Sequence, residues 1–240
     1  MLSSLPCERC SAHNTNTCRP FDGQPQAEFR GAPVREHWRP RQLLFRAGDA
    51  LGPVFKITEG IAALFAVLPD GRRQLIRFLW PGTICGYLSE NGCYSFDGEA
   101  ITNVQACSFA RHSFDSFVAH DGAFANALRA EMSAAFEEFG LHMTVLGQLD
   151  SVERVADFLL SMQEAFRACG IQTSPLRLPM KRKQMANYLG LRATAVNRAF
   201  NELRRRQLIV PEGDGVTIID VAGLAVSAGS KEHFCALQRA

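Results

Sequence analysis

The apolar residues of this 240-residue chain change their spacing near Asp121, and this change restricts the possible folds more than any other feature. From residue 29 to about 120, short apolar runs are separated by turn sequences such as Pro69-Asp70-Gly71 and Asp97-Gly98. Short runs bounded by Gly, Pro and Asp are typical of antiparallel strands in a compact barrel or jelly roll. After Asp121 the spacing becomes helical. We therefore expect an α+β fold with an N-terminal β domain followed by helices.

The first helical segment carries a narrow apolar strip. Its members lie 4, 3, 4 and 3 residues apart: Met132, Phe136, Phe139, Met143 and Leu146. This is the heptad spacing of a coiled-coil seam. A long helix packed on its own β domain would also explain the strip, but its narrow, continuous form favours a parallel contact with a second copy. We therefore expect a dimerisation helix at residues 123–150 and a homodimer.

The C-terminal third has the pattern of two short helices joined by a turn. An amphipathic helix after Asp150 ends at Cys169-Gly170, and Pro175 and Pro179 mark a linker. Two helices are then expected at residues 182–188 and 193–206, with the turn at Gly190. This is helix-turn-helix spacing, and residues 209–219 predict a β-hairpin wing behind it.

Positive charge gathers in the same segment, although the net charge of the chain is only +2. Between residues 181 and 206 there are eight Lys or Arg residues and one acid, Glu202. Lys and Arg near a helix start contact DNA phosphates, which adds affinity without sequence preference. We expect this contact from Lys181, Arg182 and Lys183 and from the run 204–206. A basic, solvated helix face is the alternative.

The second helix has polar residues away from its apolar face. They are Arg192, Thr194, Asn197, Arg198 and Asn201. Arg forms a bidentate contact with guanine, Asn pairs similarly with adenine, and Thr contacts either a base edge or a thymine methyl. We therefore predict that this helix enters the major groove of double-stranded DNA, with Asn197 and Arg198 as the main base-reading residues.

Three of the eight cysteines lie in the first 18 residues, as Cys7, Cys10 and Cys18. Residues 1 to about 27 have neither helical nor strand spacing, so a bound metal centre is one way to order them. The chain has no apolar run near the roughly 18 residues of a membrane span and no secretory signal pattern at its start. A cytoplasmic protein without a membrane partner is expected. In a reducing compartment, metal ligation is a better hypothesis for these cysteines than disulfides.

Three short motifs, in this order along the chain, resemble the CRP/FNR superfamily of bacterial transcription regulators. They are Leu44-Phe45-Arg46-Ala47-Gly48-Asp49, Val152-Glu153-Arg154-Val155-Ala156 and Tyr188-Leu189-Gly190-Leu191. The resemblance covers nearly the whole chain. It implies an N-terminal β-roll (jelly-roll) sensor domain, a long dimerisation helix and a C-terminal winged helix-turn-helix domain. The corresponding limits are 1–28 for the cysteine-rich arm, 29–122, 123–150 and 151–240.

The resemblance also bears on the signal that the sensor domain detects. The cyclic-nucleotide type carries Gly-Glu-Leu and Arg-Ser in its phosphate-binding segment, where this chain has Gly86-Tyr87-Leu88 and Asp97-Gly98. The ribose-binding acid and the phosphate-binding arginine are missing at these matching positions, so no cyclic nucleotide is expected. The oxygen-sensing FNR branch instead holds a [4Fe-4S] cluster on three N-terminal cysteines and one β-roll cysteine. The matching residues here are Cys7, Cys10, Cys18 and Cys107.

Alternatives remain for these four thiols. The same residues suit a tetrahedral zinc site, or they are free thiols on the arm. Cys85 or Cys93 is an alternative fourth ligand. Cys169 and Cys235 lie in the far domain and are expected to have no part in the site.

Two positions depart from the family pattern. The family's DNA-reading signature, Glu-x-x-Ser-Arg, keeps only its arginine in the segment from Thr194 to Arg198, so the operator is expected to differ. Phe139 aligns with an acidic residue that, in an oxygen-sensing relative, keeps the cluster-free form monomeric. Two buried phenylalanines favour association by roughly 1.5 to 3 kcal/mol per side chain. We therefore expect this chain to dimerise even without a cluster.

The sequence thus predicts a homodimeric transcription regulator that senses oxygen or redox state. A zinc-stabilised or cluster-free regulator that responds to another signal, such as nitric oxide, is the alternative. By analogy with the family, Asp70 and Arg72 on a β hairpin are candidate contacts for RNA polymerase. An enzyme is not expected, because the chain has no P-loop, no Gly-x-Gly-x-x-Gly and no Cys-x3-Cys-x2-Cys motif.

Overall fold

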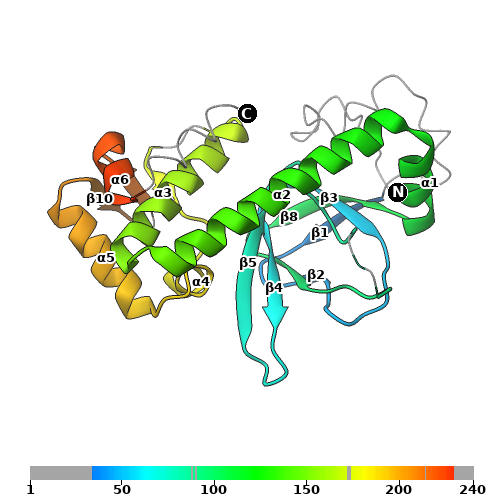
Figure 1. Cartoon of the computed structure of the whole chain (residues 1–240), viewed down its shortest axis with the longest axis horizontal. Helices are drawn as coiled ribbons and strands as arrows, with labels where there is room; N and C mark the ends of the chain where they lie inside the picture. The colour runs from blue at the N-terminus through cyan, green and yellow to red at the C-terminus, as the bar shows by residue number, and fades with distance from the viewer. Residues whose placement is uncertain (1–33, 88, 90, 172–173, 214, 230–240) are drawn as a thin grey trace. The chain divides into compact units, whose positions relative to one another are not determined.

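The computed structural model describes residues 34–87, 89, 91–171, 174–213 and 215–229. Its N-terminal part is a β-roll, and its C-terminal part is mostly helical (Figure 1). The strands of the roll are β1 (Val34–Trp38), β2 (Leu43–Phe45), β3 (Val54–Glu59), β4 (Ala62–Val67), β5 (Arg73–Leu79), β6 (Ile84–Cys85), β7 (Asp97–Ala100) and β8 (Val104–Phe109).

Within the described residues, these strands form two antiparallel sheets, ordered β1-β8-β3-β6 and β2-β7-β4-β5. Most neighbours are far apart in sequence, as expected for a jelly roll, whereas β4 and β5 form a simple hairpin. The predicted turn at Pro69-Asp70-Gly71 is the tip of that hairpin: Asp70 accepts a hydrogen bond from the Arg72 backbone N–H (3.0 Å). The expected β-roll is therefore present.

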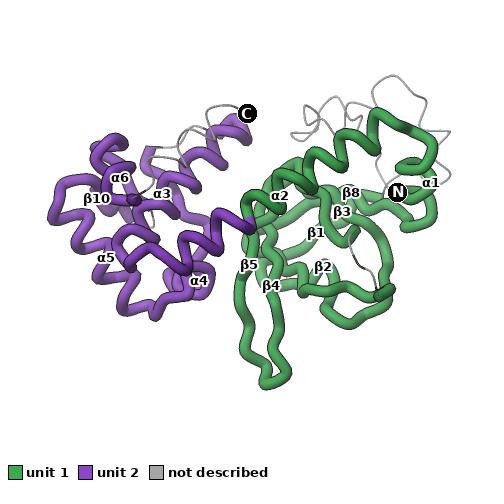
Figure 2. The backbone as a smooth tube through the Cα atoms, viewed as in Figure 1, with its two compact units in different colours: residues 1–138 green, residues 139–240 purple. Residues whose placement is uncertain are grey.

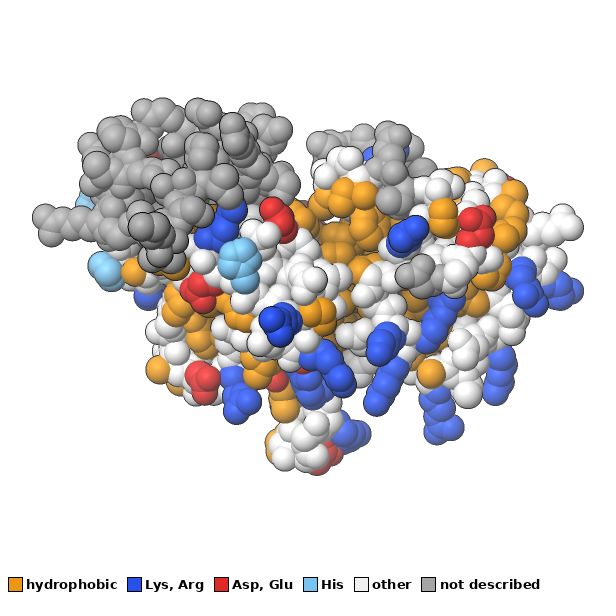
Figure 3. Space-filling model, turned by 180° about the vertical axis from the view of Figure 1, so that it is seen from behind, with side chains coloured by type: hydrophobic (Ala, Val, Ile, Leu, Met, Phe, Trp, Pro, Cys, Tyr) orange, Lys and Arg blue, Asp and Glu red, His pale blue; other side chains and the backbone are white. Residues whose placement is uncertain are grey.

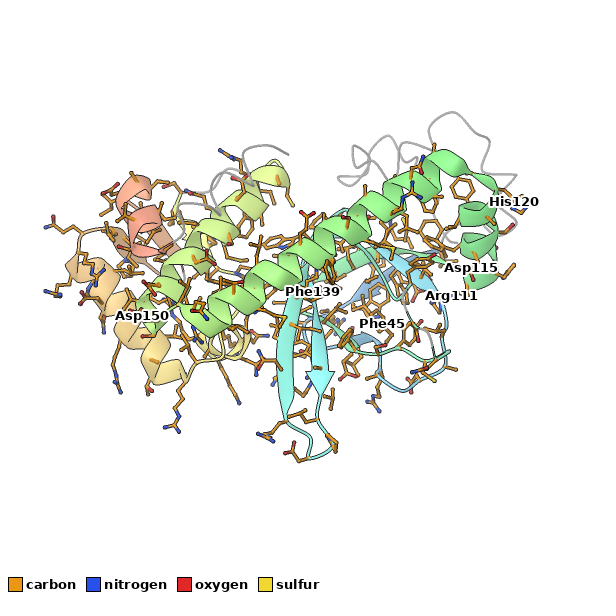
Figure 4. All side chains as sticks on the ribbon, viewed as in Figure 1. Phe45, Arg111, Asp115, His120, Phe139 and Asp150 are labelled. Carbon is orange, nitrogen blue, oxygen red and sulfur yellow. The ribbon has the colours of Figure 1, made fainter. Side chains whose placement is uncertain are left out.

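Aromatic side chains fill the space between the two sheets. The ring of Phe45 stacks on Tyr94 (4.6 Å between centroids) and on Phe55 (5.9 Å), and Trp38 packs edge-on against Phe55 (5.5 Å). Figure 4 labels Phe45 inside the roll. The hydroxyl group of Tyr94 also donates a hydrogen bond to the Pro53 carbonyl (2.9 Å). The interior of the roll is therefore packed by its own side chains.

A second apolar cluster lies on the other face of β3 and β8. Helix α1 (Arg111–His120) and the start of α2 (Gly122–Gln148) cover it. Its buried members are Val54, Phe109, Phe114, Phe124 and Leu128. Two polar contacts add to this packing: Glu131 of α2 accepts a hydrogen bond from the Ile84 N–H (2.7 Å), and Glu138 pairs with Arg77 (2.9 Å). The first half of α2 is thus fixed to the roll.

The chain divides into two compact units, residues 1–138 and 139–240 (Figure 2). The division falls inside α2, which sequence analysis had assigned to a segment of its own. The sequence-based domain limits therefore stay a prediction, and the arm at 1–28 lies outside the described residues.

The C-terminal unit contains the end of α2 and all later elements. These are α3 (Ser151–Ala168), β9 (Leu176–Arg177), α4 (Arg182–Tyr188), α5 (Ala193–Arg205), β10 (Ile209–Glu212), β11 (Gly215–Ile218) and α6 (Val221–Ser227). Asp150 caps α3, because its carboxylate accepts the N–H groups of Val152 (2.7 Å) and Glu153 (3.0 Å). Figure 4 labels Asp150 at the junction of α2 and α3. Gly170, with φ of 73°, follows the end of α3, as predicted.

Strands β10, β11 and β9 form a small antiparallel sheet, and β10 packs against α5. The β10–β11 hairpin is the expected wing, whereas β9 is a third strand that the residue spacing did not predict. The predicted fold class, an α+β chain with a β-roll, a long helix and a winged helix-turn-helix, is therefore confirmed. Across the part of the chain that the structure describes, no helix combines the length and the apolar character needed to cross a bilayer.

Candidate nucleic-acid interface and sensor site

Helices α4 and α5 pack against each other through one apolar face of each. Met185, Leu189, Val196, Phe200 and Leu203 are buried, as the spacing predicted. The turn between the helices contains Gly190, whose φ of 61° is unfavourable for any residue with a Cβ atom. The two helices therefore form one rigid pair.

The opposite face of α5 is open to solvent. All five predicted DNA-reading residues are exposed there: Arg192, Thr194, Asn197, Arg198 and Asn201. Between them, Val196, Ala199 and Phe200 face inward. In the right half of Figure 3, Lys and Arg side chains project along the lower margin of the C-terminal unit. An exposed helix face with Arg, Asn and Thr next to basic side chains has the chemistry of a major-groove reader.

The basic residues of α4 have different environments. Lys181 and Lys183 are exposed, as expected for phosphate contacts. The guanidinium of Arg182 instead lies over the Phe200 ring, 3.3 Å from its centroid, and Nη1 is 3.7 Å from the Met185 sulfur. Burial lowers the pKa of Arg182. This side chain packs within the helix pair, a contact that residue spacing does not reveal.

Arg182 and Lys183 make a matched pair for a test. Arg182→Ala is expected to lower the free energy of unfolding by about 1 kcal/mol, because it removes a cation–π contact. Lys183→Ala is expected to leave stability unchanged but to weaken binding to all DNA sequences, with the salt slope smaller by about 1. Urea unfolding and salt-dependent DNA titrations measure the two effects. Equal stability of the two variants would contradict this division.

The acid at the end of α5 pairs with two of the three arginines that follow it. Glu202 contacts Arg205 (2.8 Å) and Arg206 (2.8 Å), while Arg204 is exposed. Hydrogen bonds from Arg205 and Arg206 hold the pKa of Glu202 at about 2, so its carboxylate is charged at neutral pH. Any phosphate contact of Arg205 or Arg206 would compete with these pairs.

The four predicted metal ligands fall into two groups. Cys7, Cys10 and Cys18 lie outside the described residues. Cys107 is half-buried in β8, beside Arg35 of β1 and Lys56 of β3, and it packs against the apolar cluster under α1 and α2. The described residues bring no group of three or more His, Cys, Asp or Glu side chains together as a metal site.

The two alternative fourth ligands lie elsewhere. Cys85 belongs to the core between the sheets, and burial raises the pKa of its thiol to about 12, with a smaller contribution from Glu131. A thiol of this kind is a poor metal ligand, because ligation requires the thiolate. Cys93 is partly exposed in the segment between β6 and β7, where its backbone forms an isolated antiparallel β-bridge with Ala50. Burial thus disfavours Cys85, while Cys93 and Cys107 are both partly accessible.

Residues Gly86-Tyr87 and Asp97-Gly98, which the resemblance relates to a cyclic-nucleotide site, make hydrogen bonds within the protein. Arg111, labelled in Figure 4, donates hydrogen bonds to the backbone carbonyls of Gly52 (3.2 Å), Gly86 and Tyr87 (2.9 Å). Asp97 accepts a hydrogen bond from the Ala47 N–H (2.9 Å). The resemblance to the cyclic-nucleotide type predicts an arginine in this segment, where the chain has this carboxylate.

Next to it, Glu99 is also buried, and both acids share one arginine. Arg73 contacts Glu99 at 2.7 Å and Asp97 at 3.4 Å, and its guanidinium lies 4.2 Å from the centre of the Phe65 ring. One guanidinium thus pairs with two carboxylates on the same strand.

The five residues of the predicted dimer seam also differ in burial. Phe136 (80% exposed) and Met143 (72%) are open to solvent. Met132 packs on the cluster under α2, and Phe139 and Leu146 are half-buried. The exposed part of the seam is thus centred on Phe136 and Met143.

Sequence reasoning did not recognise Arg154, Arg111 or Arg73 as organising residues. Each binds backbone carbonyls or carboxylates far away in the sequence. In the sequence, the place of Arg154 in the segment Val152–Ala156 is the one signal of its role.

A β-roll followed by a long helix and an exposed DNA-reading helix defines a helix-turn-helix regulator with an N-terminal sensor domain. Comparison with known proteins supports this class. The model of the cyclic nucleotide-binding domain matches residues 35–121, and the model of the Crp-like helix-turn-helix domain matches residues 153–226.

Similar proteins of this class align over most of the chain. The transcriptional activatory protein AadR of Rhodopseudomonas palustris is 32% identical over 223 residues, covering 89% of this chain and 90% of AadR. The nitrogen fixation regulation protein FixK of Bradyrhizobium diazoefficiens is 29% identical over 224 residues, covering 93% and 94%. The solved structure of FixK2 from Bradyrhizobium japonicum has a similar fold, with a TM-score of 0.74 and 24% identity over 82% of this chain and 98% of that one. The chain belongs to the CRP/FNR family: it is a DNA-binding transcription regulator and not an enzyme.

Proposed function

We propose that this regulator is a homodimer that binds a near-palindromic operator and senses oxygen or a related redox signal through a [4Fe-4S] cluster. Cys7, Cys10, Cys18 and Cys107 are the proposed ligands. Four thiolates satisfy such a cluster, which would supply a redox centre that responds to its exposure to solvent and oxidants. The dimer would place its two α5 helices about one turn of DNA apart, roughly 34 Å.

The position of Cys107 carries this proposal. In the β1–β8 register, Val34 is opposite Ser108 and Arg35 is opposite Cys107. The start of β1, the first described strand after the N-terminal cysteines in the sequence, is therefore next to this thiol. Cys107 also packs on the cluster that contains Phe124 and Leu128 of α2. A change at Cys107 is thus one layer of side chains away from the proposed dimerisation helix.

The packing between the sheets supports the exclusion of cyclic nucleotides, because Tyr94 packs against Phe45 inside the roll. Asp97 and Glu99 lie on β7, where the resemblance places the phosphate-binding arginine, and both pair with Arg73. A ligand of this size would need to displace packed aromatic rings, which costs free energy. We therefore propose that the sensor domain of this protein does not bind cyclic nucleotides.

The N-terminal cysteines also suit a zinc site, and a regulator without a metal but with another signal, such as nitric oxide, is the second candidate. The matching cysteine spacing of Cys7, Cys10 and Cys18 is the observation that favours the cluster. On the β4–β5 hairpin, the exposed pair Asp70 and Arg72 (2.7 Å) is a proposed contact for RNA polymerase.

Metal analysis of cysteine variants tests the proposal. Wild-type protein purified without oxygen is expected to contain about four irons and four sulfides per chain and to lose its brown absorbance in air. Cys107→Ser is expected to lose the iron, because a cubane then lacks one ligand. Cys169→Ser and Cys93→Ser, which alter other partly exposed thiols, are expected to keep it. If Cys107→Ser keeps the iron and Cys93→Ser loses it, Cys93 is the fourth ligand. About one zinc per chain, or no metal, would reject the cluster.

A further inference from the structure

The side chain of Arg154 joins three segments of the C-terminal unit. Although it belongs to the first turn of α3, its guanidinium donates three hydrogen bonds to backbone carbonyls outside that helix. Nη2 donates to Leu146 (2.7 Å), Nε to Leu149 (2.9 Å) and Nη1 to Leu189 (2.9 Å). The first two carbonyls are at the end of α2, and the third is 35 residues further along the chain, at the end of α4.

These carbonyls are the groups that a helix leaves without partners. The last four carbonyls of any α-helix have no intrahelical donor, and the C-terminus carries a partial negative charge. Helix α2 ends at Gln148, and Leu189 is the C-cap of α4. One guanidinium therefore satisfies the C-terminal ends of two helices at once. Only an arginine offers several donors in a rigid planar fork; a lysine brings the same charge on a single nitrogen.

A second contact joins the same two helices. The ring of His142 on α2 stacks on the ring of Tyr188, the last residue of α4, with 4.1 Å between centroids and 15° between planes. Close to it, a Cβ atom at Gly190 would lie 3.5 Å from the Leu146 side chain and 3.6 Å from Arg154. The end of α2 and the turn of the helix-turn-helix are thus in direct side-chain contact, with Arg154 between them.

We propose that Arg154 is the positioning residue that fixes the helix-turn-helix pair on the end of α2 and so sets which spacing of DNA half-sites a dimer accepts. The inference rests on the proposed dimer on a near-palindromic operator. In such a dimer α2 relates the two copies, so the joint at Arg154 determines where each α5 lies. A loose joint lets each helix pair find its half-site independently.

The test measures spacing preference. The probe is a duplex selected by the wild-type protein from random DNA, together with versions whose half-sites are moved apart or together by two base pairs. Wild-type protein is expected to prefer the selected spacing. Arg154→Gln is expected to reduce this preference about fivefold or more, the scale of typical coupling between sites, while affinity for a single half-site stays unchanged. Arg154→Lys is expected to fall between the two, because it keeps the charge but not the fork.

Controls separate positioning from unfolding. Arg167→Gln removes an exposed arginine of the same helix, paired with Glu164 (2.6 Å), and is expected to behave as wild type. If Arg154→Gln does not fold, as judged by circular dichroism, the same spacing preference is measured with Arg154→Lys and His142→Ala instead. Folded variants at Arg154 with wild-type spacing preference overturn the role of this residue. A wild-type protein that is monomeric, or indifferent to spacing, overturns the proposed dimer and this role with it.

Discussion

Phe136→Glu is expected to convert the protein from a dimer into a monomer. Phe136 is 80% exposed in the single chain, and Met143, two helical turns further on, is 72% exposed. Burying a phenylalanine is worth about 1.5 to 3 kcal/mol, and a dimer loses two of them, or about 3 to 6 kcal/mol. The dissociation constant should rise by about a hundredfold to ten-thousandfold. Repulsion between two close carboxylates adds to this effect.

Sedimentation or light scattering on metal-free protein measures this change. The wild-type chain is expected to be a dimer even without the proposed cluster, as the apolar Phe139 in the seam predicts. Leu141→Glu is the matched control: it adds the same charge to the same helix, but about 140° around the axis from Phe136. A monomeric metal-free wild type would overturn the expectation that the chain dimerises without a cluster. Equal dissociation of both variants would place the dimer contact elsewhere on the chain.

Arg198→Ala is expected to cost about 1 to 3 kcal/mol per half-site, roughly 5- to 150-fold in affinity, and to relax the preference for one base pair. The reason is that Arg198 is exposed on α5 while its neighbour Ala199 is buried, so the guanidinium extends away from the core. A bidentate contact with guanine is lost together with its discrimination. Competition binding with selected and substituted duplexes measures both quantities.

Arg204→Ala serves as the comparison for this variant. Arg204 is also exposed, but it lies in the last turn of α5. Loss of a phosphate contact weakens binding to all sequences about equally and lowers the salt slope. If Arg198→Ala also weakens selected and unrelated DNA to the same degree, Arg198 contacts the backbone, and Asn197 becomes the main candidate for base reading.

The sequence predicted the helix-turn-helix almost to the residue. Met185, Val196 and Leu203 recur at helical spacing and are buried in the structure. Local patterns suffice here because two short helices and a glycine turn are specified by neighbours in the sequence. The β-roll was also predictable as a class, since turn residues punctuate short apolar runs. Its strand order was not, because β1 pairs with β8 across some 70 residues.

The heptad strip was harder to interpret. Met132 and Phe136 have the same spacing pattern, yet Met132 packs on the roll and Phe136 is exposed. At 100° per residue, Phe136 and Met143 lie along one edge of the strip, and this edge is exposed. The half-buried members lie along the other edge: Met132, Phe139 and Leu146. Periodicity detects an apolar strip, but it does not identify which surface covers each member.

Charged residues were the least predictable. Arg182 was grouped with Lys181 and Lys183 because all three are basic and adjacent, whereas its guanidinium lies on Phe200. Arg154 reaches Leu189, 35 positions away. A long side chain has many reachable partners, and only the tertiary structure selects one. The sequence therefore gives the charge of a site more readily than the contacts within it.

The edge-on contact of Trp38 with Phe55 has a practical consequence for spectroscopy. The chain has two tryptophans, Trp38 and Trp80, and both belong to the N-terminal unit. Tryptophan emission therefore reports the melting of the roll alone, while far-ultraviolet circular dichroism also follows the helices of the C-terminal unit. Non-coincident transitions by the two probes would reveal that the units unfold separately. The wild-type protein thus carries its own domain-specific fluorophores, without an added label.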